Sequence, residues 1–354
     1  MAVFAGLAAG MQSCKKEVPT ATKAVEVHSR VYPQGENATA ALLFWDSNTF
    51  NNKWLTGADG ATLKYGPVLL QNDIDYYNFE GGRTLTVDME YPEDEKEYIY
   101  ATGYAPYNAL EASQNYKTLT VKSGYDNGKT DFLACDGNEA HKGSASDLFT
   151  NEDHELKFRH LTPRIRFVGI RDEVMYGVIS VNDVKVTLHG NNNLYIPKSF
   201  VYRSNNTEQT YVAEGFTQIT EPLVLEQETK DYIPANEDGL SLMSCYVFHK
   251  VLPDSFNPFE ENAPEGTGTV SLTLDISADF SWYTQDGNPV FFERAEWNNR
   301  TVSISLKHGG EYFYPGYEYV VYITFKRDAV ILQGVQQNWE DGGIHYLPVS
   351  PEEK

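Results

Sequence analysis

Side chains with catalytic or metal-binding potential are scattered through this sequence and do not form recognised motifs. The chain contains no HExxH zinc motif, no GxSxG nucleophile turn and no GxxxxGK(S/T) phosphate loop. His154 and His160 stand six residues apart in a strand-like stretch, where His160 shares a face with Leu156 and Phe158. A histidine on an apolar face belongs to a core more often than to a metal site. We therefore expect His160 to be a buried, hydrogen-bonded residue.

The acidic residues likewise select no catalytic pair. Residues 126–131 (DNGKTD) partly resemble a calcium loop, but they lack its alternating ligands and its terminal glutamate, so a hairpin turn is expected. Among 50 Asp and Glu residues, no spacing singles out a glycosidase pair. A secreted hydrolase would need acids and histidines to converge in a cleft. The sequence predicts a non-enzyme with no metal and no cofactor.

The net charge excludes one class of partner. Lys and Arg number 28 against 50 Asp and Glu, which gives a formal charge of −22. Binding to nucleic acid requires clustered cations, so no nucleic-acid partner is expected. Aromatic residues make up 13% of the chain, with 24 Tyr among them, a profile more typical of surface proteins than of cytoplasmic enzymes.

The N-terminal segment is typical of an export signal. Residues 2–11 (AVFAGLAAGM) are apolar but far shorter than the ~20 residues that span a bilayer. Cys14 follows after Gln12 and Ser13, as in bacterial lipoprotein signals. We expect residues 1–13 to be a signal peptide, Cys14 to be acylated and residues 14–24 to be a tether; an unacylated signal peptide is the alternative. Lipid on Cys14 would hold the mature chain at a membrane.

Two further cysteines, Cys135 and Cys245, lie 110 positions apart in the sequence. An exported protein could pair them in a disulfide, and the sequence alone leaves this open. No CxxC or Cys/His spacing indicates a metal site. We favour two separate buried thiols.

The hydrophobic pattern is that of strands. Apolar residues alternate over 184–188, 270–276, 302–306 and 317–325, and Gly- and Asp-rich turns separate such runs. Short helices are plausible only around 106–112 and 144–151. This pattern predicts an all-β fold of antiparallel Greek-key β-sandwiches. The length favours two domains, residues 25–176 and 177–354, with the boundary in the loop 171–177.

Five segments, in this order, carry a resemblance to a known family: residues 98–107 (YIYATGYAPY), 131–134 (DFLA), 156–167 (LKFRHLTPRIRF), 315–325 (PGYEYVVYITF) and 335–343 (VQQNWEDGG). Together they resemble the fimbrillin (Mfa-like, FimA-like) surface lipoproteins of Bacteroidetes. The last segment matches the Trp that closes such domains. The resemblance covers roughly residues 25–343.

The resemblance implies two tandem transthyretin-like β-sandwiches and a structural or adhesive role as a stalk, anchor or tip subunit of fimbriae. Its implied partners are other fimbrial subunits and host or bacterial receptors, and its implied location is the outer membrane, reached through the lipid anchor. Assembly in the family follows cleavage after an Arg in the first strand, and another subunit's strand then fills the groove. Arg30 is the matching cleavage candidate. Ile344, Tyr346 and Val349 form a short candidate donor strand, in which Pro348 removes one ladder hydrogen bond.

A surface lipoprotein that binds glycans and never polymerises is the alternative. The exposed aromatics it needs would be Trp282 with Tyr283, or residues 312–314 (YFY). Packing of these rings in the sandwich is the expectation we favour. The path of residues 25–30 separates the two functions: a removable strand supports exchange, and a tail outside the fold supports a tethered module.

Overall fold

The computed structural model describes residues 24–32, 40–46, 63–70, 83–94, 96–114, 116–151, 153–172, 180–204, 209–235, 239–253, 256, 265–283, 289–326 and 329–338. These residues form strands, together with the short 3-10 helices η2 (Tyr107–Ala109) and η3 (Ala145–Asp147), and no α-helix occurs among them. The predicted all-β class is confirmed. The two helical stretches expected from the sequence are reduced to these single turns.

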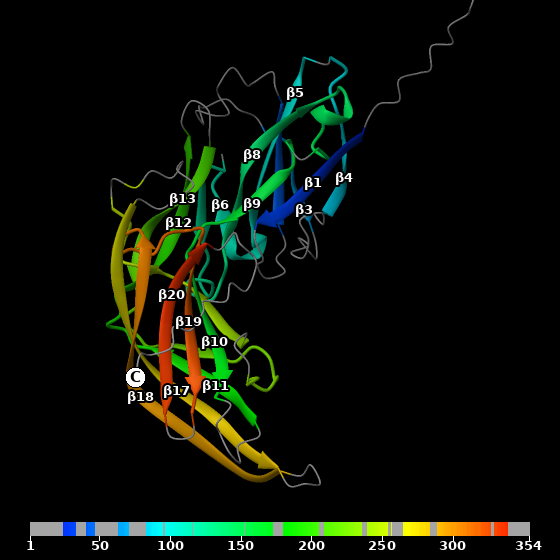
Figure 1. Cartoon of the computed structure of the whole chain (residues 1–354). Helices are drawn as coiled ribbons and strands as arrows, with labels where there is room; N and C mark the ends of the chain where they lie inside the picture. Colours follow the sequence, from blue (N-terminus) through cyan, green and yellow to red (C-terminus); the bar gives the residue numbers. More distant parts are fainter. Residues whose placement is uncertain are drawn as a thin grey trace, which may run out of the picture.

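The first sheet has seven strands in the order β3-β2-β5-β8-β9-β1-β4 (Figure 1). One face covers a core that includes Phe44, Phe149 and Phe158, all fully buried. The strands are β1 (Ala24–Tyr32), β2 (Ala40–Asp46), β3 (Leu63–Leu70), β4 (Arg83–Glu90), β5 (Tyr98–Ala105), β8 (Leu133–His141) and β9 (Leu156–His160).

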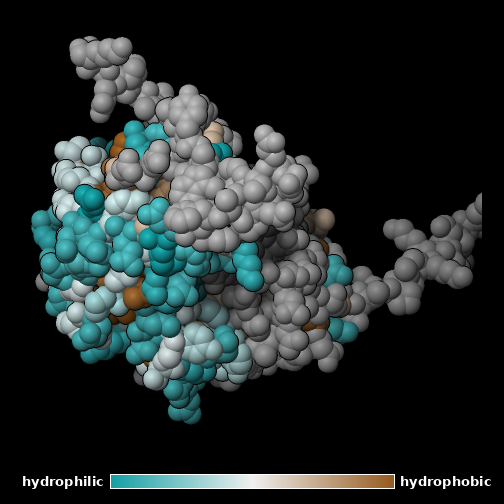
Figure 2. All heavy atoms as spheres, turned by 90° about the horizontal axis from the view of Figure 1, so that it is seen from below, coloured by the Kyte–Doolittle hydropathy of each residue, from teal (hydrophilic) through white to brown (hydrophobic). Residues whose placement is uncertain are grey.

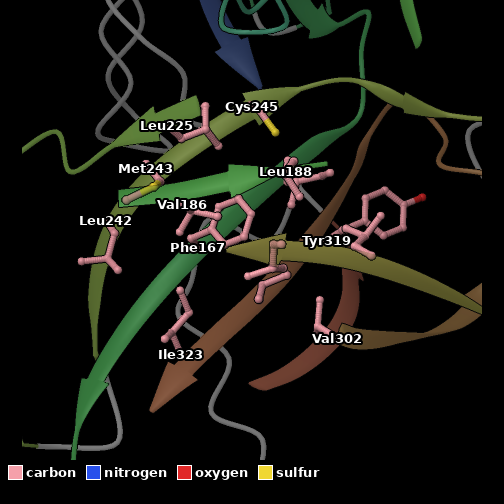
Figure 3. Packing of buried hydrophobic residues seen from close by; sticks show 14 of the residues in the cluster. Phe167, Val186, Leu188, Leu225, Leu242, Met243, Cys245, Val302, Tyr319 and Ile323 are labelled. Atoms are coloured by element: carbon pink, nitrogen blue, oxygen red, sulfur yellow. The ribbon is translucent and has the colours of Figure 1, made fainter. Parts of the chain in front are cut away.

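The second sheet has eight strands in the order β14-β11-β17-β18-β20-β19-β10-β15. Strands β18 and β20 pair at only two positions, so the sheet turns at this seam and its two halves enclose one core (Figure 3). The strands are β10 (Arg164–Arg171), β11 (Ser180–Leu188), β14 (Leu223–Glu226), β15 (Leu240–Tyr246), β17 (Glu265–Tyr283), β18 (Pro289–His308), β19 (Tyr317–Phe325) and β20 (Val330–Asn338).

A third, five-stranded sheet covers the other face of the first. Its main order is β13-β12-β7-β6, with β16 paired to β12. Phe200 and Tyr211 of this sheet pack in one cluster with Leu43, Tyr104 and Phe132 of the first half. The strands are β6 (Leu110–Ala112), β7 (Thr118–Val121), β12 (Leu194–Ser204), β13 (Gln209–Gln218) and β16 (Phe248–His249).

The chain passes from the first sheet to the second between β9 and β10, at residues 161–163. Strand β10, which precedes the boundary expected from the sequence, pairs with β19 and β15. Strand β7, from the first half, pairs with β12 from the second. The division into domains at residues 176 and 177 stays a prediction.

The alternation read from the sequence is borne out over residues 270–276. In β17 the side chains of Val270, Leu272, Leu274 and Ile276 are all at most 1% exposed. Alternate residues of a strand point to opposite faces, which explains why the intervening Ser and Thr residues lie outside the core. The hairpin of β17 and β18 forms the lower end of the molecule in Figure 1.

Candidate strand-exchange site around the first strand

Strand β1 lies inside the first sheet, with a partner on each side. It pairs antiparallel with β4, where Val25 is opposite Val87, and parallel with β9, where Ser29 is opposite Leu156. Figure 1 shows it in dark blue between these two strands. It is therefore neither a tail nor an edge strand, and its removal would leave unpaired backbone groups along both β4 and β9.

The core beneath β1 is apolar and closed. Val25 is fully buried and belongs to the same cluster as Val87, Leu156, Phe158 and Cys135. Each of these side chains is at most 3% exposed. A groove left by β1 would therefore combine two open backbone edges with an apolar floor, the features that bind an extended strand from another chain.

Of the site residues predicted from the sequence, the structure describes only the backbone of Arg30. The backbone of Arg30 lies in β1 opposite Lys157 of β9. Cys14 lies outside the described residues, as do the donor candidates Ile344, Tyr346 and Val349. Strand β20 ends at Asn338, six positions before the donor segment begins, and the closing Trp of the motif also lies outside.

A buried, hydrogen-bonded pair of side chains lies at the end of the strand beside β1. His160, at the end of β9, lies 2.8 Å from the carboxylate of Asp131, which directly precedes Phe132 and β8. Both side chains are almost completely buried. The expectation of a satisfied core histidine is confirmed. The pair ties β9 to β8 at the point where the chain leaves the first sheet.

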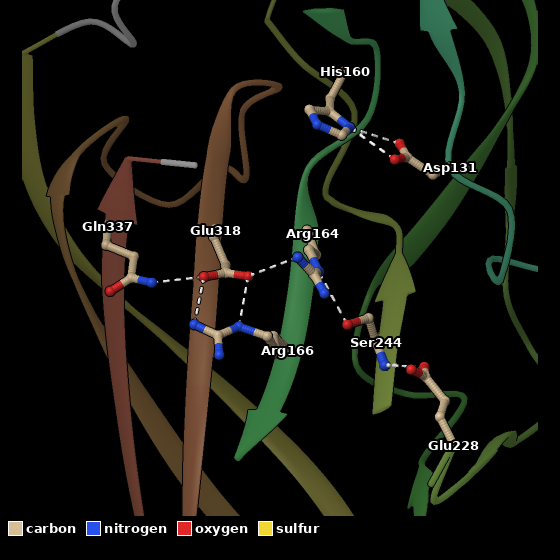
Figure 4. Close-up of polar contacts among 8 residues, drawn as sticks. All are labelled: Asp131, His160, Arg164, Arg166, Glu228, Ser244, Glu318 and Gln337. Carbon is tan, nitrogen blue, oxygen red and sulfur yellow. Dashed lines mark hydrogen bonds and ion pairs between the residues drawn. The ribbon is translucent and has the colours of Figure 1, made fainter. Parts of the chain in front are cut away.

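Three of the sequence motifs meet in one polar cluster that sequence reasoning missed (Figure 4). Arg166 donates to both carboxylate oxygens of Glu318, at 2.7 and 2.8 Å. Arg164 lies 3.3 Å from the same carboxylate, and Gln337 donates to it at 2.6 Å. Arg164 also donates to Ser244 on β15, at 3.0 Å. These contacts tie β10, β19, β20 and β15 together.

The charges in this cluster are strongly coupled. Burial alone would raise the pKa of Glu318, but the hydrogen bond from Arg166 and the charge of Arg164 outweigh it and hold that pKa below its ordinary 4.5. Burial would lower the pKa of Arg164, and the neighbouring Tyr246 and Glu318 hold it above its ordinary value. The only signal in the sequence was charged residues inside otherwise apolar strands. Arg166 and Glu318 are 152 residues apart, so the sequence alone could not show that they form a pair.

The two described cysteines are buried, lie in different cores and are not joined in a disulfide. Cys135 belongs to the core beneath β1, and Cys245 to the core of the second sheet. Burial raises the pKa of the Cys245 thiol far above its ordinary value. The expectation of two separate thiols is confirmed.

The aromatic residues considered for glycan binding do not form an exposed platform where they are described. Phe313 is fully buried and Tyr314 is 2% exposed. The Phe313 ring stacks on Tyr319 with centroids 3.7 Å apart. The expected packing of residues 312–314 is confirmed for these two rings. The backbones of Trp282 and Tyr283 lie in β17, and their side chains are outside the described set.

The calcium-like loop is a turn that satisfies its own polar groups. Asp126 accepts the N–H of Gly124 and Asn127 accepts the N–H of Lys129, each at 2.9 Å. Within the described part of the chain, no group of His, Cys, Asp and Glu side chains is arranged to hold a metal ion. No described helix has the length and apolarity needed to cross a bilayer.

No family model and no curated protein sequence matches the chain. The comparison with solved structures does find matches. A fimbrial protein from Bacteroides vulgatus shares 15% identity over 89% of this chain and 99% of its own, with a TM-score of 0.43. A candidate cell adhesion protein from Bacteroides ovatus shares 14% over 90% and 98%, with a TM-score of 0.45. The tip fimbrial protein Mfa3 from Porphyromonas gingivalis, truncated at its C-terminus, shares 10% over 89% and 99%, with a TM-score of 0.34. All three of these proteins are described as fimbrial or cell adhesion proteins.

Proposed function

We propose that this chain is a non-catalytic, fimbrillin-like subunit of the bacterial surface that assembles by exchanging β1 for a strand of another subunit. The observation that carries the proposal is the position of β1, which is an inner strand over an apolar core and contains Arg30. The order of the fimbrillin-like motifs and the lipoprotein-like signal ending at Cys14 support it.

Cleavage after Arg30 divides β1 unequally. All pairs between β1 and β4 involve residues Ala24 to Ser29, so the cut frees that whole ladder. On the β9 side, Val31 and Tyr32 keep their pairs, while Ser29 and Arg30 lose theirs. The cut also separates the folded body from Cys14, and therefore from a lipid on that residue. Processing would thus open the groove and release the subunit from its tether together.

The segment 344–349 of another copy is our candidate for the incoming strand. The Ile344 and Tyr346 side chains share one face of an extended strand and would fill pockets that β1 vacates, whereas Val349 would lie on the opposite face. The backbone of the segment would pair with β4 and β9. Such a head-to-tail contact does not close on itself and propagates into a fibre. Because the segment is short and contains Pro348, we assign the chain an accessory, anchor or tip position as readily as a stalk position.

Cys135 reports directly on the groove. We expect limited digestion by an Arg-specific protease to cut at Arg30 and to raise the rate at which a thiol reagent modifies Cys135 by about tenfold or more, because its cover is lost. Cys245 is the internal control, since it lies in the other core and should stay protected. Cys14→Ser removes the third thiol, and Arg30→Gln provides the uncleaved control.

Assembly gives the second readout. A synthetic peptide of residues 339–354 should protect Cys135 again, and the cleaved protein alone should form oligomers in light scattering. Cleavage at Arg30 that leaves Cys135 protected, with only monomers at high concentration, would refute strand exchange at this site.

A further inference from the structure

The core of the second sheet is sealed along one side. At the β15 edge, Tyr246 donates its N–H to Gly128 at 2.7 Å and Ser244 donates to the Glu228 side chain at 3.2 Å. The N–H of Glu228 returns to the carbonyl of Leu242 at 2.8 Å, and that of Ile233 binds Val181 at 3.0 Å. Chain segments thus cover the ends of both half-sheets here.

The opposite side, between β18 and β20, is closed only over a short length. Ile304 pairs with Gly334, and Ser305 with Val335. Beyond them, the buried amide of Gln336 takes the place of a strand: it accepts from the N–H of Lys307 and of His308, at 2.7 and 3.0 Å, and donates to the His308 carbonyl at 3.2 Å. Residues 289–303 of β18 pair only with β17 among the described strands.

This open stretch of β18 is long and lies over apolar side chains. Fifteen residues at ~3.3 Å each give an edge of roughly 50 Å. Beneath it, Trp297 is 6% exposed and its ring lies 5.9 Å from those of Phe280 and Phe325. An edge of this kind normally recruits strands from other chains unless something prevents it.

Two charged residues lie on the core-facing side of this edge. Glu293 is directly opposite Phe280 and Arg300 is directly opposite Leu274. Directly opposite residues share a face, and both Phe280 and Leu274 are buried in the core. Glu293 and Arg300 are nevertheless exposed and have no ion-pair partner among the described residues. Both charged groups stay hydrated only while no further strand lies beside β18.

A bulge interrupts the same edge. The β17–β18 register shifts between Leu274 and Ile276, and Asn299 on β18 has a φ of 53°. The N–H of Asn299 is held by the Asp275 carboxylate at 2.7 Å. A bulge breaks the regular spacing that a new strand would need. Figure 2, which views the molecule from below, shows mostly hydrophilic described atoms with small separate hydrophobic patches.

We propose that Glu293 and Arg300 determine where this protein can accept a strand: their inward-facing charges close the β18 edge to the β18 strand of a second copy. An added strand would bury both charges without partners, which is strongly unfavourable. The inference concerns a different sheet from β1 and holds whether or not β1 is exchanged.

The test is the oligomeric state of the full, uncleaved chain with Cys14→Ser as background. The double variant Glu293→Val with Arg300→Val should shift from monomer to dimer or larger species in light scattering. Hydrogen exchange should slow at residues 289–303 in the associated species. The matched control, Glu296→Val with Lys307→Val, removes one acid and one base from exposed positions of the same strand without changing the net charge, and it should stay monomeric.

The milder pair Glu293→Gln with Arg300→Gln removes the charges and keeps polar side chains. This variant serves if the valine variant does not fold, and it should also shift from monomer to larger species. Persistent monomers in every folded inward variant would overturn the proposal. So would equal association of the outward control, or association with protection only outside residues 289–303. Because none of these proteins is cleaved, the outcome is independent of exchange at β1.

Discussion

At the scale of single residues, the cluster around Glu318 buries several charged groups that must all be paired. Its carboxylate is almost buried and takes hydrogen bonds from Arg166 and Gln337, with Arg164 beside it. A buried ion pair is costly to desolvate, and it becomes strongly destabilising when one partner is removed. The cluster therefore sets which strands can lie side by side, because another arrangement would leave charges unpaired.

Replacing Glu318 with Gln should lower the free energy of unfolding by about 3–5 kcal/mol, because the mostly buried Arg166 then loses the carboxylate that accepts both of its hydrogen bonds. Urea denaturation at neutral pH measures the loss. Glu226→Gln is the matched control: its contact with Lys185 is exposed on both sides, and its removal should cost no more than about 1 kcal/mol. Equal effects of the two substitutions would contradict this assignment.

The same carboxylate predicts how stability depends on pH. The pKa of Glu318 is lowered in the folded protein from its ordinary 4.5. Its ionised form therefore adds stability that is fully present above pH 4.5 and is lost as the pH falls through the lower folded pKa. The stability difference between wild type and Glu318→Gln should shrink on acidification below 4.5. A difference that stays constant would argue against an ionised Glu318.

At the scale of elements, the seam between β18 and β20 depends on one side chain. Gln336 is 4% exposed and satisfies two N–H groups and one carbonyl at the end of β18. Strand β20 could therefore join a half-sheet with which it shares only two backbone pairs. The Gln336 amide makes the hydrogen bonds that a neighbouring strand would otherwise make. The two halves of the sheet can therefore diverge beyond this point.

Gln336→Leu should destabilise the fold by about 1–3 kcal/mol, since it removes the side-chain acceptor of the Lys307 and His308 N–H groups. Hydrogen exchange at these two amides should accelerate more than exchange at Leu272 in β17. Gln333→Leu, an exposed position on the same strand, should change neither quantity. Unchanged exchange at Lys307 in the Gln336 variant would refute the capping role.

At the scale of the whole molecule, the first and second halves of the chain share a core. Phe200 and Tyr211 of the second half pack with Phe132 and Tyr104 of the first. The Phe132 and Phe200 rings lie with centroids 5.2 Å apart, and β7 pairs directly with β12. The two halves are joined by a shared core as well as by the chain. Unfolding of one half should therefore destabilise the other.

Phe200→Ala should therefore cost about 3–5 kcal/mol and loosen strands of both halves. Differential scanning calorimetry measures the cost, and hydrogen exchange at β8 measures the spread into the first half. Thr217→Ala, at an exposed position of β13, is the control. A loss confined to β12 and β13, with β8 exchange unchanged, would show that the halves are energetically independent.

Local pattern alone determined a good deal of this protein. Alternation at Val270 to Ile276 and at Tyr317 to Phe325 predicted strands, because alternate side chains of a strand face opposite sides. His160 was recognisable as a core residue for the same reason, and the acidic composition predicted no nucleic-acid partner. The order of short motifs carried the family resemblance without any long-range information.

Only the tertiary structure decided which strands are neighbours. That β1 lies between β4 and β9, that Arg166 meets Glu318, and that Glu293 shares a sheet face with the buried Phe280 all depend on pairings between residues far apart in the chain. Such pairings are selected by the free energy that many side chains gain when they are buried together. No short stretch of sequence reveals that free energy.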